Sequence, residues 1–193
     1  MWSTDTNVSS EKKTLKGMIQ PITSVSTTLD GSRSLVTSTE KQAKVYNMKT
    51  CRAMETLSGH VDLIHEGKIC NTKPYGATGS GDRTVRIWDI AKGVCKRSLQ
   101  ALSSCNAIDI DCCDSMVAAG HLNGGVTIWQ LDSGEKITEL KNVHDEPLTS
   151  VRFSYDRNYL LTNSRDNTLK VIDLRRDKNM IEMKDDCKLL IMH

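Results

Sequence analysis

The sequence predicts an all-β protein made of four copies of one four-stranded unit. A bulky anchor residue ends the third strand of each copy, and successive anchors lie 42, 41 and 43 residues apart: Tyr46, Trp88, Trp129 and Ile172. Side chains alternate with a period of two before each anchor, as in a strand. No segment carries a sustained apolar stripe at the 3.6-residue period of a helix, so little helix is expected. A repeat of about 40 to 45 residues with four short strands is typical of β-propeller blades.

Each predicted blade is a first strand, a central hairpin and an outer strand. First strands are expected at residues 22–25, 64–70, 106–110 and 149–153, hairpins at 35–46, 77–89, 118–129 and 161–173, and outer strands at 53–57, 96–99, 136–140 and 180–183. The hairpin turns contain Gly, Asn and Asp, which tolerate the backbone conformations that a tight turn needs. In the strand 84–88, Val85 and Ile87 point to one face, and Trp88 points to the other.

Composition excludes several classes of protein. The net charge is +2, and this balance gives no support for nucleic-acid binding. The longest apolar run, residues 189–192, is far shorter than the roughly 20 residues of a membrane span, so no transmembrane segment is expected. Residues 1–14 are polar and show no secretory signal. The seven cysteines are an odd number without a disulfide spacing, which predicts reduced thiols in a cytoplasmic protein.

One blade resembles a complete WD repeat. Residues 58–60 read Ser-Gly-His, residues 78–82 read Thr-Gly-Ser-Gly-Asp, and residues 87–89 read Ile-Trp-Asp. In WD repeats a His, an Asp, a Ser or Thr and the Trp form a hydrogen-bonded tetrad. The resemblance implies a structural tetrad of His60, Asp82, Trp88 and either Thr78 or Ser80, of which we take Ser80 as the candidate. The other blades depart from the pattern, with Tyr46, Asn123 and Ile172 at positions where the family has Trp, Asp and Trp.

The second half of the chain is similar to the C-terminal propeller of autophagy-related protein sixteen. The similarity rests on Ser-Ser-Cys-Asn at 103–106, Ala-Gly-His at 119–121 and the run at 164–175, in which Leu-Lys-Val-Ile-Asp-Leu-Arg has Ile in place of Trp. It extends over about residues 15–183. That propeller has seven blades, and the family also has an N-terminal helix and a coiled coil. We therefore expect this chain to be a truncated isoform, a divergent paralogue or a fragment.

The expected organisation is a polar segment at 1–14, blades at 15–57, 58–99, 100–140 and 141–184, and a C-terminal segment at 185–193 that starts a further blade. Four blades of a seven-bladed ring would leave two open flanks. The chain is therefore expected to self-associate through its blade edges, to borrow blades from another chain or to be marginally stable.

Residues with catalytic or metal-binding potential are better explained as structural. His60, Ser80 and Asp82 are the residue types of a hydrolase triad, but the WD context favours the tetrad. Residues 76–81 resemble a phosphate-binding loop, yet no Gly-Lys-Ser/Thr follows them. Cys112 and Cys113 are adjacent, and neighbours on a strand point to opposite faces. We predict a noncatalytic protein with no metal and no cofactor.

The predicted function is protein interaction. Propellers bind peptides at the loops of one face. Arg83 and Arg165, which we expect at matching turn positions of the second and fourth blades, are the candidate contact residues, since arginine is enriched in interface hot spots. The resemblance to autophagy-related protein sixteen implies a scaffold in autophagosome formation or cargo recognition. Its partners would be the autophagy-conjugation complex or cargo receptors, and it would be recruited to autophagosomal precursor membranes through such partners. The alternative is a generic WD-repeat adaptor, such as a ubiquitin-ligase substrate receptor.

Overall fold

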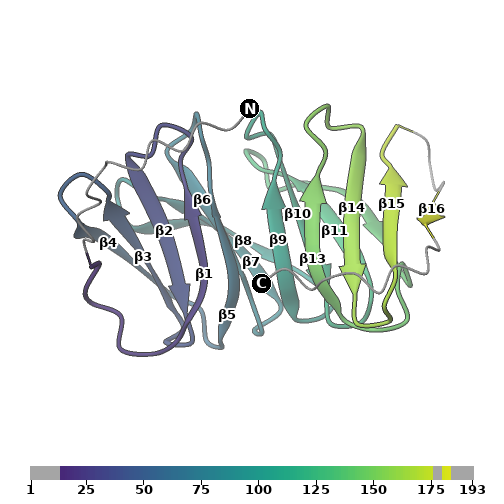
Figure 1. The fold of residues 1–193 in the computed structure, drawn as a ribbon, viewed down its shortest axis with the longest axis horizontal. Helices are drawn as coiled ribbons and strands as arrows, with labels where there is room; N and C mark the ends of the chain where they lie inside the picture. The colour runs from purple at the N-terminus through teal and green to yellow at the C-terminus, as the bar shows by residue number, and fades with distance from the viewer. Residues whose placement is uncertain (1–13, 176–179, 184–193) are drawn as a thin grey trace, which may run out of the picture.

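The computed structural model describes residues 14–175 and the backbone of residues 180–183. Sixteen strands in this part of the chain form four antiparallel sheets, or blades, each a meander in sequence order (Figure 1). Blade 1 contains β1 (Ile22–Thr27), β2 (Arg33–Ser38), β3 (Gln42–Asn47) and β4 (Arg52–Ser58). Blade 2 contains β5 (Ile64–Ile69), β6 (Tyr75–Ser80), β7 (Thr84–Asp89) and β8 (Val94–Gln100). Blade 3 contains β9 (Cys105–Ile110), β10 (Met116–His121), β11 (Val126–Gln130) and β12 (Lys136–Leu140). Blade 4 contains β13 (Leu148–Phe153), β14 (Tyr159–Ser164), β15 (Leu169–Asp173) and β16 (Met180–Met183).

The predicted all-β, four-blade architecture is confirmed. β4 and β8 each extend one residue past the expected blade boundaries at 57 and 99. The expected end segments at 1–14 and 185–193 lie outside the described residues, apart from residue 14. No helix in the described part of the chain has the length and apolar character that crossing a membrane would need.

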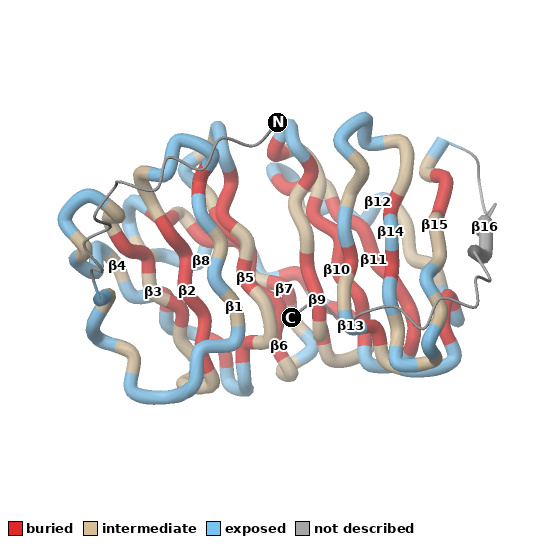
Figure 2. Tube along the Cα trace, in the orientation of Figure 1, coloured by how far each residue is buried: buried red, intermediate tan, exposed pale blue. Residues whose placement is uncertain are grey.

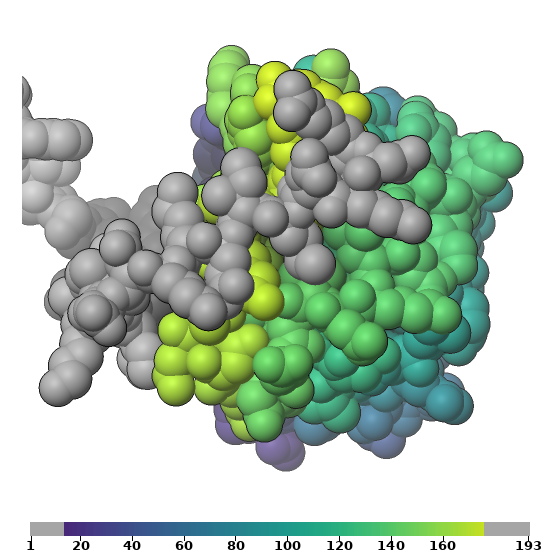
Figure 3. Space-filling model, turned by 90° about the vertical axis from the view of Figure 1, so that its right-hand side faces the viewer, coloured from purple at the N-terminus to yellow at the C-terminus, as the bar shows by residue number. Residues whose placement is uncertain are grey.

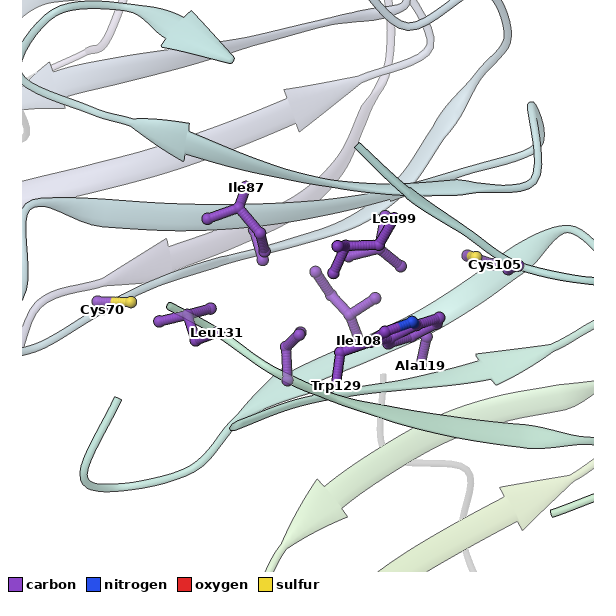
Figure 4. Close-up of a cluster of buried hydrophobic side chains, with 12 residues drawn as sticks. Cys70, Ile87, Leu99, Cys105, Ile108, Ala119, Trp129 and Leu131 are labelled. Carbon is purple, nitrogen blue, oxygen red and sulfur yellow. The ribbon is translucent and has the colours of Figure 1, made fainter. Parts of the chain in front are cut away.

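The hydrophobic core lies between blades. One buried cluster joins blades 1 and 2, a second joins blades 2 and 3, and a third joins blades 3 and 4. In the second cluster, Ile87 and Leu99 from blade 2 meet Ile108 and Trp129 from blade 3 (Figure 4). The second strand of blades 1 to 3 is buried along most of its length, whereas the outer strands β4 and β8 are mostly exposed (Figure 2). Blades 2 and 3 are therefore layers that pack against a neighbour on both faces. Figure 3 shows the blade 4 side of the molecule.

The alternation of strand β7 explains how one blade serves two clusters. Val85 and Ile87 pack towards blade 3, and Trp88 packs towards blade 1. The two faces of a strand thus contact different neighbours, as a period of two requires. The predicted orientation of these side chains is confirmed.

A buried carboxylate also joins blades 2 and 3. Asp114, in the turn between β9 and β10, is fully buried and accepts hydrogen bonds from the backbone N–H groups of Asn71, Thr72 and Lys73 and from the Thr72 hydroxyl. Burial alone would raise the pKa of Asp114, but these hydrogen bonds outweigh it and lower the pKa below the usual value. The carboxylate therefore holds the loop of one blade against the turn of the next.

Candidate interaction face

One end of the blades is formed by the turns between second and third strands, together with the loops that enter the next blade. The Gly81 N–H donates to the Leu63 carbonyl, and the Arg165 N–H donates to the Pro147 carbonyl, so turn and loop are joined in the same way in blades 2 and 4. We call this end the turn face. It comprises residues 39–41, 59–63, 81–83, 102–104, 122–125, 142–147 and 165–168.

Behind the turn face, blade 2 contains a continuous chain of hydrogen bonds. His60 Nδ1 lies 2.7 Å from Asp82 Oδ2, and His60 Nε2 lies 2.7 Å from Thr78 Oγ1. Trp88 Nε1 donates to the same Thr78 oxygen at 2.7 Å. A carboxylate only accepts, so Nδ1 donates to Asp82, Nε2 of the neutral ring accepts from the Thr78 hydroxyl, and Thr78 accepts from Trp88. The polar groups of all four side chains are thereby satisfied inside the blade.

Electrostatics favour the same protonation states. Burial lowers the pKa of His60, and the hydrogen bond to Asp82 only partly opposes this, so the imidazole is neutral near pH 7. Burial alone would raise the pKa of Asp82, but hydrogen bonds from Thr84 and His60 lower it to about 2. The pair is therefore a neutral imidazole that donates to a carboxylate.

The connectivity of this network resembles a catalytic triad, but its burial prevents that chemistry. Thr78 is 0% exposed, and its oxygen already accepts from the indole. A nucleophile needs an exposed lone pair and space for a substrate. The network instead positions the loop at 59–63, because the Val61 N–H also donates to Asp82.

Thr78 occupies the position that we expected Ser80 to fill. Both side chains belong to β6, but Ser80 ends the strand, where its hydroxyl donates to the Asp62 carbonyl and accepts from the Asp82 N–H. Two residues along a strand are about 6.6 Å, which places Ser80 at the turn and Thr78 beside the indole. Strand spacing alone does not show which of two hydroxyls on the same face reaches the ring.

Blade 4 repeats the network without its indole. His144 Nδ1 lies 2.9 Å from Asp166 Oδ2, and His144 Nε2 lies 2.9 Å from Thr162 Oγ1. Ile172 is buried at the Trp position and adds apolar contact in place of a donor. The network is therefore one donor shorter than in blade 2.

In blade 3 a histidine enters from a different position. His121 ends β10, as Ser80 ends β6, and its Nε2 lies 2.8 Å from Thr127 Oγ1. Its Nδ1 is buried and has no hydrogen-bond partner among the described residues. Burial lowers the pKa of His121 to about 4. Asn123 does not replace the missing aspartate, because its side-chain oxygen accepts from the Gly125 N–H within the turn.

Arg83 and Arg165 both lie exposed on the turn face, but they are not equivalent. Arg83 has a positive φ of 64° and corresponds to Asn167, whose φ is 63°. Arg165 corresponds to Gly81, since both donate to the loop that precedes the blade. The expected match between the two arginines is therefore wrong: Arg83 follows the half-buried Asp82 in its turn, whereas Arg165 precedes the half-buried Asp166.

Exposed apolar side chains accompany the arginines on the turn face. Val61 is 72% exposed, Leu102 is 60% exposed and Leu122 is 51% exposed, and all three belong to loops of blades 2 and 3. The sequence does mark these three side chains, as apolar residues in segments that the strand pattern assigns to loops, although they were not among the expected contact residues. Together with Arg83, they give this face the mixture of apolar and cationic groups that interfaces use.

Comparison with known proteins agrees with the fold. The family described as "WD domain, G-beta repeat" matches residues 51–89 and 134–173. These two segments of the chain are therefore WD repeats. Protein tipD of Dictyostelium discoideum is 37% identical over 177 residues, which cover 91% of this chain and 29% of that protein. Autophagy-related protein 16 of Arabidopsis thaliana is 30% identical over 176 residues, which cover 91% of this chain and 34% of that protein.

A third relative matches a shorter segment. Protein Atg16l2 of Mus musculus is 39% identical over 84 residues, which cover 44% of this chain and 13% of that protein. The predicted resemblance of this WD-repeat chain to autophagy-related protein sixteen is confirmed. The chain spans about a third or less of the length of these relatives.

Proposed function

We propose that this WD-repeat chain is a noncatalytic interaction scaffold that serves autophagosome formation or cargo recognition in the cytoplasm. The observation that carries the proposal is the alignment of 91% of the chain with autophagy-related protein 16. Its partners would be proteins of the autophagy-conjugation complex or cargo receptors, and these partners would bring it to autophagosomal precursor membranes.

The geometry supports binding rather than catalysis. The networks around His60 and His144 are closed inside their blades, and they hold the loops of the turn face. A loop that is already ordered loses less conformational entropy when a partner binds. The turn face presents Arg83, Arg165 and exposed apolar groups, which suit a peptide with acidic and apolar side chains.

Affinity purification from cells tests the proposal. The tagged 193-residue chain is compared with a variant that carries Arg83→Glu and Arg165→Glu, and bound autophagy proteins are quantified by mass spectrometry. Reversing both charges should weaken the affinity for the bound autophagy proteins about tenfold, which corresponds to about 1.4 kcal/mol of binding free energy.

The matched control carries Lys49→Glu and Lys92→Glu. These lysines are also exposed, but they lie in the turns between third and fourth strands, at the opposite end of the blades. The control should bind like the unchanged chain. Equal losses in both variants would contradict a role for the turn face, and recovery of ubiquitin-ligase components instead of autophagy proteins would favour the generic adaptor.

A further inference from the structure

The structure brings the two adjacent cysteines together. Cys112 and Cys113 are the central residues of a β-turn between β9 and β10, which the Asp114 N–H closes by donating to the Asp111 carbonyl at 3.0 Å. Their Sγ atoms are 3.8 Å apart, and both residues are exposed. The expectation that these side chains point to opposite faces assumed a strand, and it does not apply to a turn.

The turn that carries the two thiols is held from both ends. The buried Asp111 carboxylate accepts hydrogen bonds from the Ser115 N–H, the Ser115 hydroxyl and the Met116 N–H. Asp114 holds the neighbouring loop of blade 2, as described above. The two sulfur atoms therefore belong to a preorganised turn, which lowers the entropic cost of engaging both at once.

The separation of the sulfur atoms suits a bridging atom better than a direct bond. A disulfide needs about 2.05 Å between the sulfur atoms, so forming one would require this turn to change. Two bonds of about 2.3 Å from one soft centre, at angles of about 90 to 110°, place the sulfur atoms about 3.3 to 3.8 Å apart. The observed distance lies at the wide end of this range, so a bridging atom can bind both sulfurs with little movement of the turn.

We propose that Cys112 and Cys113 form a bidentate dithiol site for one soft, thiophilic centre that brings its own remaining ligands, as a trivalent organoarsenical does. Soft centres prefer thiolates. No group of three or more His, Cys, Asp or Glu residues that could hold a metal ion occurs in the described part of the chain. A ligand that needs only two protein donors therefore fits this turn better than a metal that needs four.

The reaction with phenylarsine oxide balances without an oxidant or a reductant. Two arsenic–sulfur bonds form, the arsenic–oxygen bond breaks, and both thiol protons leave with that oxygen as one water molecule. Cys112 Sγ also lies 3.2 Å from the Tyr155 carbonyl of blade 4, to which its S–H donates. Losing the thiol proton removes this contact between blades 3 and 4.

Intact-mass spectrometry of the reduced full chain, treated with one equivalent of phenylarsine oxide, tests the site. The expected product carries one phenylarsenic group and has lost two hydrogens. It should survive an excess of 2-mercaptoethanol and be released by dithiothreitol, because only a dithiol can compete with a chelate. Cys112→Ser and Cys113→Ser should each weaken retention of the phenylarsenic group by about 100-fold or more. In each variant only one sulfur of the turn can bind arsenic, so a second arsenic–sulfur bond would have to come from another molecule.

Cys95→Ser is the matched control, because Cys95 is an exposed thiol outside this turn. It should leave the adduct unchanged. Tryptic peptide mapping of the adduct of the unsubstituted chain provides a measurement that does not depend on the folding of any variant. It should locate arsenic on the tryptic fragment 98–136, which contains Cys112 and Cys113. Loss of the adduct to 2-mercaptoethanol, its retention by either serine variant, or its mapping to another fragment would overturn the proposal.

Discussion

Acid should destabilise blade 3 through His121, and His121→Gln should remove that part of the acid sensitivity. Burial lowers the pKa of His121 to about 4, whereas an unfolded histidine titrates near pH 6.5. The unfolded chain therefore takes up this proton first as the pH falls. The stabilising contribution of the neutral ring is complete above pH 6.5 and is lost progressively as the pH falls towards 4.

The size of the effect follows from the two pKa values. Each pKa unit corresponds to 1.36 kcal/mol, so about 3 kcal/mol of unfolding free energy is at stake over the whole window. At pH 4.5 most of it, about 2.5 kcal/mol, should already be lost. Asp82 and Asp166, each with a pKa of about 2, lose their contributions below pH 3.8, and so their effect falls outside this range.

Urea unfolding at pH 7.5, 6.5, 5.5 and 4.5, followed by tryptophan fluorescence, measures the effect in both proteins. Glutamine is neutral throughout, so His121→Gln lowers stability at pH 7.5 but should show a flatter profile. The stability gap between the two proteins should shrink by about 2 to 3 kcal/mol between pH 7.5 and 4.5. A gap that stays constant over this range would refute the assignment of the acid sensitivity to His121.

Three further predictions concern the stability of the blades and are tested by thermal or urea unfolding. Asp82→Ala should cost about 1 to 3 kcal/mol, because it leaves the buried His60 Nδ1–H and the N–H groups of Val61 and Thr84 without their acceptor, whereas Asn123→Ala should cost less because its side chain accepts one hydrogen bond within its turn; equal small losses would contradict this. Asp114→Ala should cost about 3 kcal/mol, since four hydrogen bonds between blades 2 and 3 end on that carboxylate, and a loss below 1 kcal/mol would argue against its role. Gly124→Ala should destabilise far more than Gly31→Ala, which should cost about 1 to 2 kcal/mol: both glycines have positive φ, but a Cβ at Gly124 would overlap the His144 carbonyl, and at Gly31 it would meet open space.

The architecture could be predicted from the sequence because a propeller repeats one local pattern. The anchors at Tyr46, Trp88, Trp129 and Ile172 recur at nearly equal spacing, and strand alternation determines which faces are apolar. These properties depend on residues close together in the chain. They led to the strand order, the low helix content, the direction of Trp88 and the resemblance to autophagy-related protein sixteen.

The tertiary structure decided everything that depends on register between segments far apart in the chain. It selected Thr78 over Ser80, because only one hydroxyl lies within reach of both His60 and the indole. It separated Arg83 from Arg165 by placing them at different turn positions. The sequence shows which residue types are present and how far apart they lie along the chain. A hydrogen bond also requires a particular distance and direction between two groups, and these are set only when the blades pack.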